Sequence, residues 1–392
     1  MTTPLRYKLA ENTIDEHDLK LLADWLATNP WLTQGPLVRE FEARWARWVG
    51  TAHALFVNSG SSANLLMYYA ALLSPRLRSK TVVVPAVSWP TSVAPAIQLG
   101  FEPVMCEAED RTFGIDPDAL ARLCEQRPVG AVVVVHVLGV PVELDAILKL
   151  RDRHGFLLLE DACAATGSRY DGRPVGTFGD VSAFSFFFGH HLSTIEGGMV
   201  CTPHTDLQDL LLQARSHGWA KDVPREREAV MASTEGVIAF NRPFTFYIPG
   251  FNLRSTDLNA RLGLAQLDKA DAVVARRREN HALYQKKFAG APGFACQVNP
   301  RASISSISFA ALASSVEHRA RIGAALGAAG IETRPVGGGN MSRQPFWRER
   351  YGTTVFPIAD RLHDTAFQLP NHPGLSLDDI AYIADTALAV KP

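Results

Sequence analysis

The sequence predicts an α/β fold in which a large domain with a mainly parallel central sheet precedes a smaller C-terminal α+β domain. Short apolar runs alternate with amphipathic stretches through the first two thirds of the chain, a pattern typical of strands joined by helices. The chain has 392 residues, too many for one compact core, and this length favours about two domains.

The elements of the large domain follow from this alternation. Strands are expected in the apolar runs at 53–58, 81–85, 131–137, 156–161, 182–188 and 198–202. Helices are expected between them, at 61–73, 90–99, 117–125, 143–153 and 205–216.

The pattern changes after residue 222. Residues 222–250 are first charged and then aromatic, so an irregular segment is expected there, and such long segments are usually functional or lie between domains. Residues 256–290 predict one long helix, and residues 300–392 mix strands and helices. We therefore expect a large domain over residues 1–255, including an N-terminal arm, and a small domain over residues 256–392.

Composition argues against several classes of protein. The net charge is −1, and no basic cluster indicates a nucleic-acid surface. The polar N-terminus lacks the apolar core of a signal peptide, and the longest apolar run, residues 129–142, is too short to span a bilayer. The five cysteines show no CxxC spacing, which argues against a disulfide framework and a zinc site. A cytoplasmic protein that binds neither nucleic acid nor a membrane is expected.

Residues 58–66, NSGSSANLL, predict a turn of small residues that opens a helix. Ligands of open α/β sheets bind beyond the carboxyl ends of the strands, and this turn follows the first strand. Free N–H groups at the helix start would favour an anion, Gly60 would allow close approach, and Ser61 and Ser62 would add hydroxyl groups. A plain serine N-cap explains the same residues equally well.

Two further side chains follow strand ends. Trp89, in PAVSWP (85–90), is either a core aromatic residue or a flat surface for a ring-shaped ligand. Asp161, which ends the run LLLED, either caps the next helix or pairs with a protonated ring nitrogen.

The stretch FSFFFGHHLSTIEGG (184–198) places adjacent histidines, His190 and His191, after a strand. Histidine is the usual proton shuttle near neutral pH, although a structural role fits as well. No metal site is expected, because adjacent side chains on an extended backbone diverge and no other ligand lies nearby in the sequence. Ser193 to Glu196 match a capping box, which would give Glu196 a structural role. The residues alone indicate an α/β enzyme with an anion site and a candidate base.

Together these stretches resemble the DegT/StrS sugar aminotransferases, which are pyridoxal-phosphate enzymes of fold type I that act on nucleotide-linked keto sugars. The matching blocks cover nearly the whole chain, at 33–42, 58–66, 84–92, 160–180, 184–198 and 250–267. The resemblance implies the fold type I architecture and a homodimer with shared active sites.

The chain departs from the family at one decisive position. The aminotransferases carry, after the SFF motif, the lysine that binds the cofactor covalently, and His190 stands in its place here. The paired histidines followed by EGG resemble the 3-dehydratase branch of the family. A related branch holds an iron–sulfur cluster through four downstream cysteines, but only Cys201 and Cys296 follow His191, so no such cluster is expected.

The resemblance implies a lyase-type 3-dehydratase that holds its cofactor noncovalently, as pyridoxal 5'-phosphate or pyridoxamine 5'-phosphate. His190 would act first as a base and then as an acid, expelling the C3 hydroxyl of a nucleotide-linked 4-keto-6-deoxy sugar. The expected substrate is GDP-4-keto-6-deoxy-D-mannose, and the products are ammonia and a 4-keto-3,6-dideoxy sugar of the kind found in lipopolysaccharide O-antigens. L-Glutamate would re-aminate the cofactor after each turnover.

Further site residues are implied by position in the matching blocks. Residues expected at the cofactor phosphate are Gly60, Ser61, Ser62, Ser185 and, from a partner subunit, Asn252. Trp89 would stack on the cofactor ring and Asp161 would pair with its nitrogen. His217 and Arg254 would meet the glutamate. Residues expected at the nucleotide sugar are Trp31, Thr33, Lys221 and Glu332. Many aminotransferases of the family have a glutamine near the ring hydroxyl, where this chain has Ala164.

Two other interpretations stay open at this point. The protein would be an ordinary sugar aminotransferase if another lysine bound the cofactor, and Lys221 is the nearest candidate. It would otherwise be a cofactor-binding regulator without activity, although such a protein has no use for a complete glutamate site.

Overall fold

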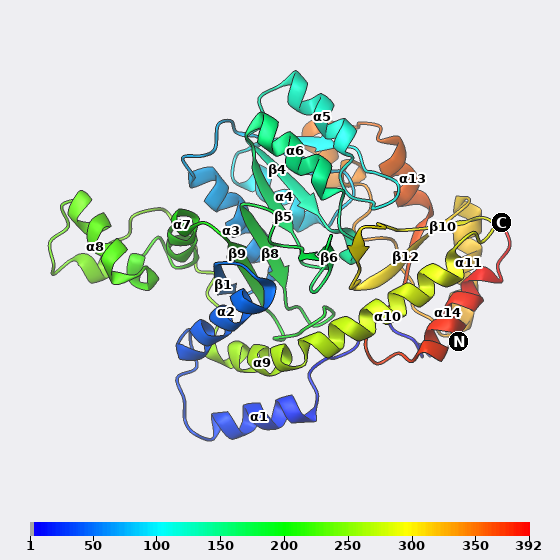
Figure 1. Ribbon diagram of the computed structural model, residues 1–392, viewed down its shortest axis with the longest axis horizontal. Helices are drawn as coiled ribbons and strands as arrows, with labels where there is room; N and C mark the ends of the chain where they lie inside the picture. The colour runs from blue at the N-terminus through cyan, green and yellow to red at the C-terminus, as the bar shows by residue number, and fades with distance from the viewer. Residues whose placement is uncertain (1–3) are drawn as a thin grey trace.

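The computed structural model describes residues 4–392, and a seven-stranded sheet with helices on both faces lies at its centre (Figure 1). In spatial order the strands are β1 (His53–Val57), β9 (Gly198–Thr202), β8 (Val181–Ser185), β5 (Leu157–Asp161), β4 (Ala131–Val135), β2 (Thr81–Pro85) and β3 (Glu102–Cys106). The pairs from β8 to β3 are parallel, whereas β9 is antiparallel to both β1 and β8. The predicted α/β fold is confirmed.

Both faces of this sheet are buried, because its strands are apolar on both sides. In β5, Leu157 and Leu159 pack on one face and Leu158 packs on the other. The first face is covered by α3 (Gly60–Leu73), α4 (Ala94–Gln98) and α7 (Thr205–Arg215). The second face is covered by α5 (Pro117–Gln126) and α6 (Leu144–His154), and, beside β1 and β9, by α2 (Pro36–Val49) and α9 (Asp257–Asp268).

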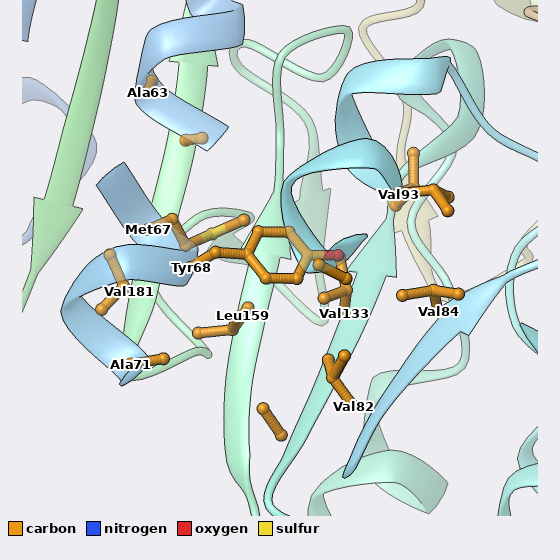
Figure 2. Packing of buried hydrophobic residues seen from close by; sticks show 14 of the residues in the cluster. Ala63, Met67, Tyr68, Ala71, Val82, Val84, Val93, Val133, Leu159 and Val181 are labelled. Carbon is orange, nitrogen blue, oxygen red and sulfur yellow. The ribbon is translucent and has the colours of Figure 1, made fainter. Parts of the chain in front are cut away.

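Helix α3 connects this core to the carboxyl edge of the sheet. Figure 2 shows Met67, Tyr68 and Ala71 of α3 packed with strand residues such as Val133 and Leu159. The buried Tyr68 hydroxyl donates a hydrogen bond of 2.6 Å to the Ser92 carbonyl, which satisfies its polar end. The middle of α3 is therefore held beside the loop that follows β2.

The C-terminal part of the chain forms a second, smaller sheet. Its strands are β10 (Phe294–Cys296), β12 (Ser308–Ala313) and β13 (Ala366–Pro370). The long helix α10 (Ala270–Phe288) runs from the large sheet to this smaller one (Figure 1) and packs there with α11 (Val316–Ala328) and α14 (Leu377–Leu388). The remaining elements are α1 (Glu16–Leu26), α8 (Arg225–Thr234), α12 (Pro345–Tyr351), α13 (Pro357–Thr365), and a small sheet of β6 (Arg169–Tyr170), β7 (Arg173–Pro174) and β11 (Ala302–Ser303).

Several sequence expectations were wrong. Strand β3 was missed, because it is an edge strand that begins with an exposed glutamate and a proline. The single helix expected over 256–290 is two helices, since the chain leaves the helical path at Lys269 (φ −106°, ψ 5°). The segment 222–250 is not wholly irregular: it contains α8, which projects from the body at the left of Figure 1. The division at residues 255 and 256 stays a prediction, and α9 packs with α2 against the large sheet.

No helix within residues 4–392 is both long enough and apolar enough to cross a membrane. The five cysteines, all within the described part of the chain, form no disulfide.

Replacing Leu159 with alanine should lower the free energy of unfolding by about 2–5 kcal/mol, because its side chain is fully buried in the core of the large sheet. Urea unfolding followed by circular dichroism measures this change. Leu19→Ala on α1 is the control, since Leu19 is 54% exposed and its replacement should change stability by no more than about 0.5 kcal/mol. Equal effects of the two substitutions would contradict the assigned core.

Candidate active site

The start of α3 packs so closely against the end of β8 and the start of β9 that only glycine fits at these contacts. A β-carbon on Gly60 would lie 2.5 Å from the Ser185 β-carbon, and one on Gly198 would lie 2.7 Å from the Gly60 nitrogen. The turn that holds Gly60, Ser61 and Ser62 is thereby brought against Ser185, as the sequence analysis expected for a shared phosphate site.

Both interpretations of this turn are compatible with its geometry. Ser59 is the N-cap, and its side chain accepts a hydrogen bond of 3.1 Å from the Ser62 amide. The amides of Gly60 and Ser61 come before the first intrahelical hydrogen bonds and are available to an anion. The turn is therefore a capped helix start that can also bind an anion.

Asp161 is buried at the end of β5 and is held by three donors from three segments. Asn64 Nδ2 and Ser92 Oγ donate to its Oδ2 atom over 2.8 and 2.7 Å, and the Cys163 amide donates to Oδ1 over 3.0 Å. A carboxylate can accept about four hydrogen bonds, so Asp161 keeps capacity for a ligand. Asn64 and Ser92 were not predicted as site residues, although both lie in the sequence blocks 58–66 and 84–92.

Trp89 is not a core residue, because 60% of its surface is exposed. It directly precedes the short 3-10 helix Pro90–Ser92, whose last residue binds Asp161. The indole is therefore exposed, three residues before a residue that binds Asp161, and a ring-shaped ligand can stack on it.

The two histidines that follow β8 differ in orientation and chemistry. His190 Nδ1 lies 2.7 Å from the Cys163 carbonyl oxygen, and because a carbonyl only accepts, Nδ1 carries the hydrogen and Nε2 keeps a lone pair. Burial lowers the pKa of His190 to about 4, and the positive charge of Arg277 acts in the same direction. His190 is therefore a neutral imidazole with a free basic nitrogen at neutral pH.

His191 serves as an anchor. Its side chain is fully buried, and its Nε2 atom donates to the Ser305 carbonyl over 2.9 Å. Burial lowers the pKa of His191 well below its usual value, so it stays uncharged. The paired residues thus combine one candidate base with one structural histidine.

Residues 252–254 lie against two other loops of the site. Arg254 pairs with Val57 across an isolated antiparallel bridge, and Asn252 pairs with Ser216 in the same way. The Arg254 Nη1 atom is buried and has no hydrogen-bond partner within the described chain. His217 is exposed, has a strained φ of +63°, and donates its amide hydrogen to the Phe251 carbonyl. An unpaired buried guanidinium nitrogen is costly, and a carboxylate ligand would satisfy it.

The four residues expected at the nucleotide sugar are placed less directly. Trp31 and Thr33 are exposed in the loop before α2. Lys221 pairs with Asp222 at 3.1 Å, and Asp222 also accepts from Gln34, which joins Lys221 to that loop. Glu332 instead accepts from the Leu9 amide over 2.8 Å. The next residue, Ala10, abuts Gly189, so Glu332 reaches the histidine stretch only through the N-terminal segment. Its contact with a ligand stays a prediction.

The expected capping box at Ser193 to Glu196 was wrong, because no helix begins there. Ser193 Oγ accepts from the Ile195 amide, and strand β9 follows at Gly198. Glu196 is exposed. Among residues 4–392, no group of three or more histidine, cysteine, aspartate or glutamate side chains is placed to hold a metal ion.

The sequence profile of the DegT/DnrJ/EryC1/StrS aminotransferase family matches residues 12–387. The chain belongs to this family. It is 33% identical to the GDP-4-keto-6-deoxy-D-mannose 3-dehydratase of Yersinia pseudotuberculosis over 342 residues, which are 86% of each chain.

Solved structures of relatives agree with this assignment. The E. coli GDP-4-keto-6-deoxy-D-mannose-3-dehydratase with bound hydrated PLP has a TM-score of 0.88 at 29% identity, covering 98% of this chain and 100% of that one. A further structure of such an enzyme holds a trapped PLP-glutamate geminal diamine, with a TM-score of 0.87 at 29% identity, covering 97% of this chain and 100% of that one.

The Helicobacter pylori aminotransferase PseC has a TM-score of 0.85 at 26% identity, covering 99% of each chain. The fold type I architecture is confirmed. Because aminotransferases are almost as similar as dehydratases, the site residues must distinguish the two reactions.

Stability should fall as the pH is lowered from about 6.5 to 4, because several histidines are buried in the neutral form. Burial lowers the pKa of His190 and His372 to about 4 and that of His281 to about 3. The unfolded chain therefore binds more protons in this window, and each such histidine contributes a slope of about 1.4 kcal/mol per pH unit. Urea unfolding at a series of pH values measures the slope.

His281→Gln should flatten this dependence, whereas His17→Gln, which alters an exposed histidine, should leave it unchanged. An unchanged slope in His281→Gln would mean that His281 does not contribute to the loss of stability in acid.

Proposed function

We propose that the protein is a glutamate-dependent 3-dehydratase that removes the C3 hydroxyl of a nucleotide-linked 4-keto-6-deoxy sugar, with GDP-4-keto-6-deoxy-D-mannose as the substrate. One observation carries this proposal: the residue beyond β8 is His190, whose Nδ1–H is bound by the Cys163 carbonyl and whose Nε2 is left as a base. An imidazole cannot bind the cofactor aldehyde as an imine, which a lysine at this position would do.

Pyridoxal phosphate is the cofactor, and when bound it supplies an electron sink for the reaction. The residues present fit it well. Asp161 would pair with the ring nitrogen and exposed Trp89 would cover the ring. The free amides at the start of α3, with Ser61, Ser62 and Ser185, would bind the phosphate. Asn252 is exposed, as a residue that reaches a partner subunit must be.

His190 would perform two proton transfers through one atom. Its neutral Nε2 takes a proton from carbon, and the resulting imidazolium returns that proton to the departing C3 oxygen. The overall reaction exchanges the sugar hydroxyl for hydrogen, while glutamate is oxidised to 2-oxoglutarate and its nitrogen leaves as ammonia. Glutamate binding is assigned to Arg254 and His217, since Arg254 Nη1 lacks a partner for its charge.

The second candidate is a sugar aminotransferase, which the similarity to PseC keeps in consideration. That reaction needs a lysine free to bind the cofactor, and Lys221 does not fit the role well. Its ammonium pairs with Asp222 and lies 5.5 Å from the centre of the Trp219 ring. A regulator without activity is the third candidate, and a complete constellation of acid, base and anion site speaks against it.

Incubating the protein with pyridoxal phosphate, glutamate and GDP-4-keto-6-deoxy-D-mannose should yield a sugar lighter by one oxygen atom, as measured by mass spectrometry. Ammonia and 2-oxoglutarate should form in equal amounts, because one glutamate is consumed per turnover. An amino sugar as the product would overturn the proposal in favour of the aminotransferase.

Borohydride reduction supplies the control for the role of His190. The wild-type protein should gain no covalent cofactor, whereas His190→Lys should become labelled, because only an imine to the chain is reduced onto it. Lys221→Met should behave as the wild type does. A labelled wild-type protein would identify another lysine and refute the noncovalent site.

Asn64→Ala should weaken binding of pyridoxal phosphate about tenfold, because it removes a 2.8 Å hydrogen bond that orients Asp161 and is worth about 1–1.5 kcal/mol. Titration of the cofactor absorbance measures the affinity. The matched control is Asn241→Ala, at an exposed asparagine outside the site. Equal affinities in the two variants would show that Asp161 needs no such support.

A further inference from the structure

Arg277 is a buried cation whose partners are all carbonyl groups. Arg277 lies in the middle of α10, and only 2% of its surface is exposed. The guanidinium donates to the carbonyls of Ile307 at 3.0 Å, of Ser306 and His190 at 3.4 Å each, and of Asn371. No carboxylate of the described residues pairs with it, although buried arginines usually have an acidic partner.

Two of the carbonyls that accept from Arg277, those of Ser306 and Asn371, belong to a buried polar cluster that also contains Ser305 and His281. Asn371 Nδ2 donates to the Ser306 carbonyl at 3.0 Å, and His281 Nδ1 lies 2.7 Å from Ser306 Oγ. His191 Nε2 binds the Ser305 carbonyl of the same cluster. The backbone of His190 and the ring of His191 are thus both attached to it.

The charges that face His190 come from two directions. Asp161 at the end of β5 favours a protonated imidazole, and Arg277 on α10 opposes it. The other titratable neighbours are uncharged: burial lowers the pKa of His191, His281 and His372, and it raises the pKa of the Cys163 thiol. Burial lowers the pKa of Arg277 itself to about 9, which leaves it charged at neutral pH. Among the described residues whose charge acts on His190, Arg277 is therefore the one cation.

We propose that Arg277 is a positioning residue of the site, which holds the His190 backbone through its carbonyl and adds to the burial that keeps the imidazole uncharged between turnovers. This inference rests on the proposed role of His190 as base and acid. A neighbouring cation destabilises the imidazolium, so a proton taken up at Nε2 is passed on readily. Hydroxide is a poor leaving group, and an imidazolium that gives up its proton easily allows the C3 oxygen to leave as water. The charge would thus favour the second proton transfer over the first.

The test is a titration of the His190 imidazole, followed by NMR of the full-length protein with isotope-labelled histidine and assigned with a His190→Gln variant. Wild-type His190 should titrate near pH 4. Arg277→Met should raise that value by at least one pH unit, while Arg277→Lys, which retains the charge, should stay close to the wild type. The acid limb of the pH–rate profile should shift in parallel.

Arg278→Met is the matched control, because Arg278 is the next residue of α10 and binds the Gly167 carbonyl, which is none of the four carbonyls that Arg277 binds. It should leave the His190 titration unchanged. An unchanged titration of His190 in Arg277→Met would overturn the proposal, because Arg277 would then have no effect on the charge of the imidazole. If that variant does not fold, a wild-type His190 that titrates near pH 6.5 would overturn the proposal by itself. The titration follows an imidazole and not turnover, so an amino-sugar product would refute the proposed function without affecting this result.

Discussion

The hydrogen bond between His190 Nδ1 and the Cys163 carbonyl is the interaction on which the chemistry of the site depends. It decides that Nε2, and not Nδ1, is the basic nitrogen, and it joins the loop after β5 to the loop after β8. The amide of Cys163 in turn donates to Asp161. The acid assigned to the ring nitrogen and the base assigned to proton transfer are therefore held by the two ends of one residue, so their separation cannot change without breaking one of these hydrogen bonds.

The position of His190 also depends on the fixed shape of the loop that follows β8. The antiparallel strand β9 fixes this loop at its other end. Because β9 returns between β1 and β8, residues 186–197 must form a closed loop. The Phe186 amide donates to the Gly197 carbonyl, and the Thr194 amide donates to the Phe186 carbonyl. Asn259 on α9 binds the Thr194 carbonyl over 2.8 Å, which holds the turn although Ile195 has an unfavourable φ of +70°. The strained backbone of Ile195 persists because these hydrogen bonds on either side of it fix the shape of the turn.

Most of the large sheet could be predicted because its strands are continuous apolar runs buried on both faces, and β4 (AVVVV) is the clearest case. Edge strand β3 lacks that signal. At the break between α9 and α10, the Lys269 ammonium pairs with Asp15 and Asp18, and no local pattern records contacts between residues so far apart in the sequence. Within the site, Asp161 and His190 could be singled out as candidates from their positions after strands. The donors Asn64 and Ser92 could not, since each is far from Asp161 in the sequence and only the fold brings them together. The contact of Glu332 with the Leu9 amide could not be predicted either, because the two residues lie near opposite ends of the chain.

The burial of this site also explains why histidine suits the position better than an unattached lysine. An imidazole has an ordinary pKa of about 6.5, so at neutral pH it enters a desolvated pocket beside Arg277 already uncharged, with little cost. A free lysine, with an ordinary pKa of about 10.4, would have to lose its proton over more than three pKa units, a cost of about 5 kcal/mol. In an aminotransferase the covalent bond to the cofactor removes that difficulty. With a noncovalently held cofactor, as proposed, a neutral base is the least costly group that the pocket can hold, and the charge of Arg277, which no carboxylate of the described residues neutralises, favours it further.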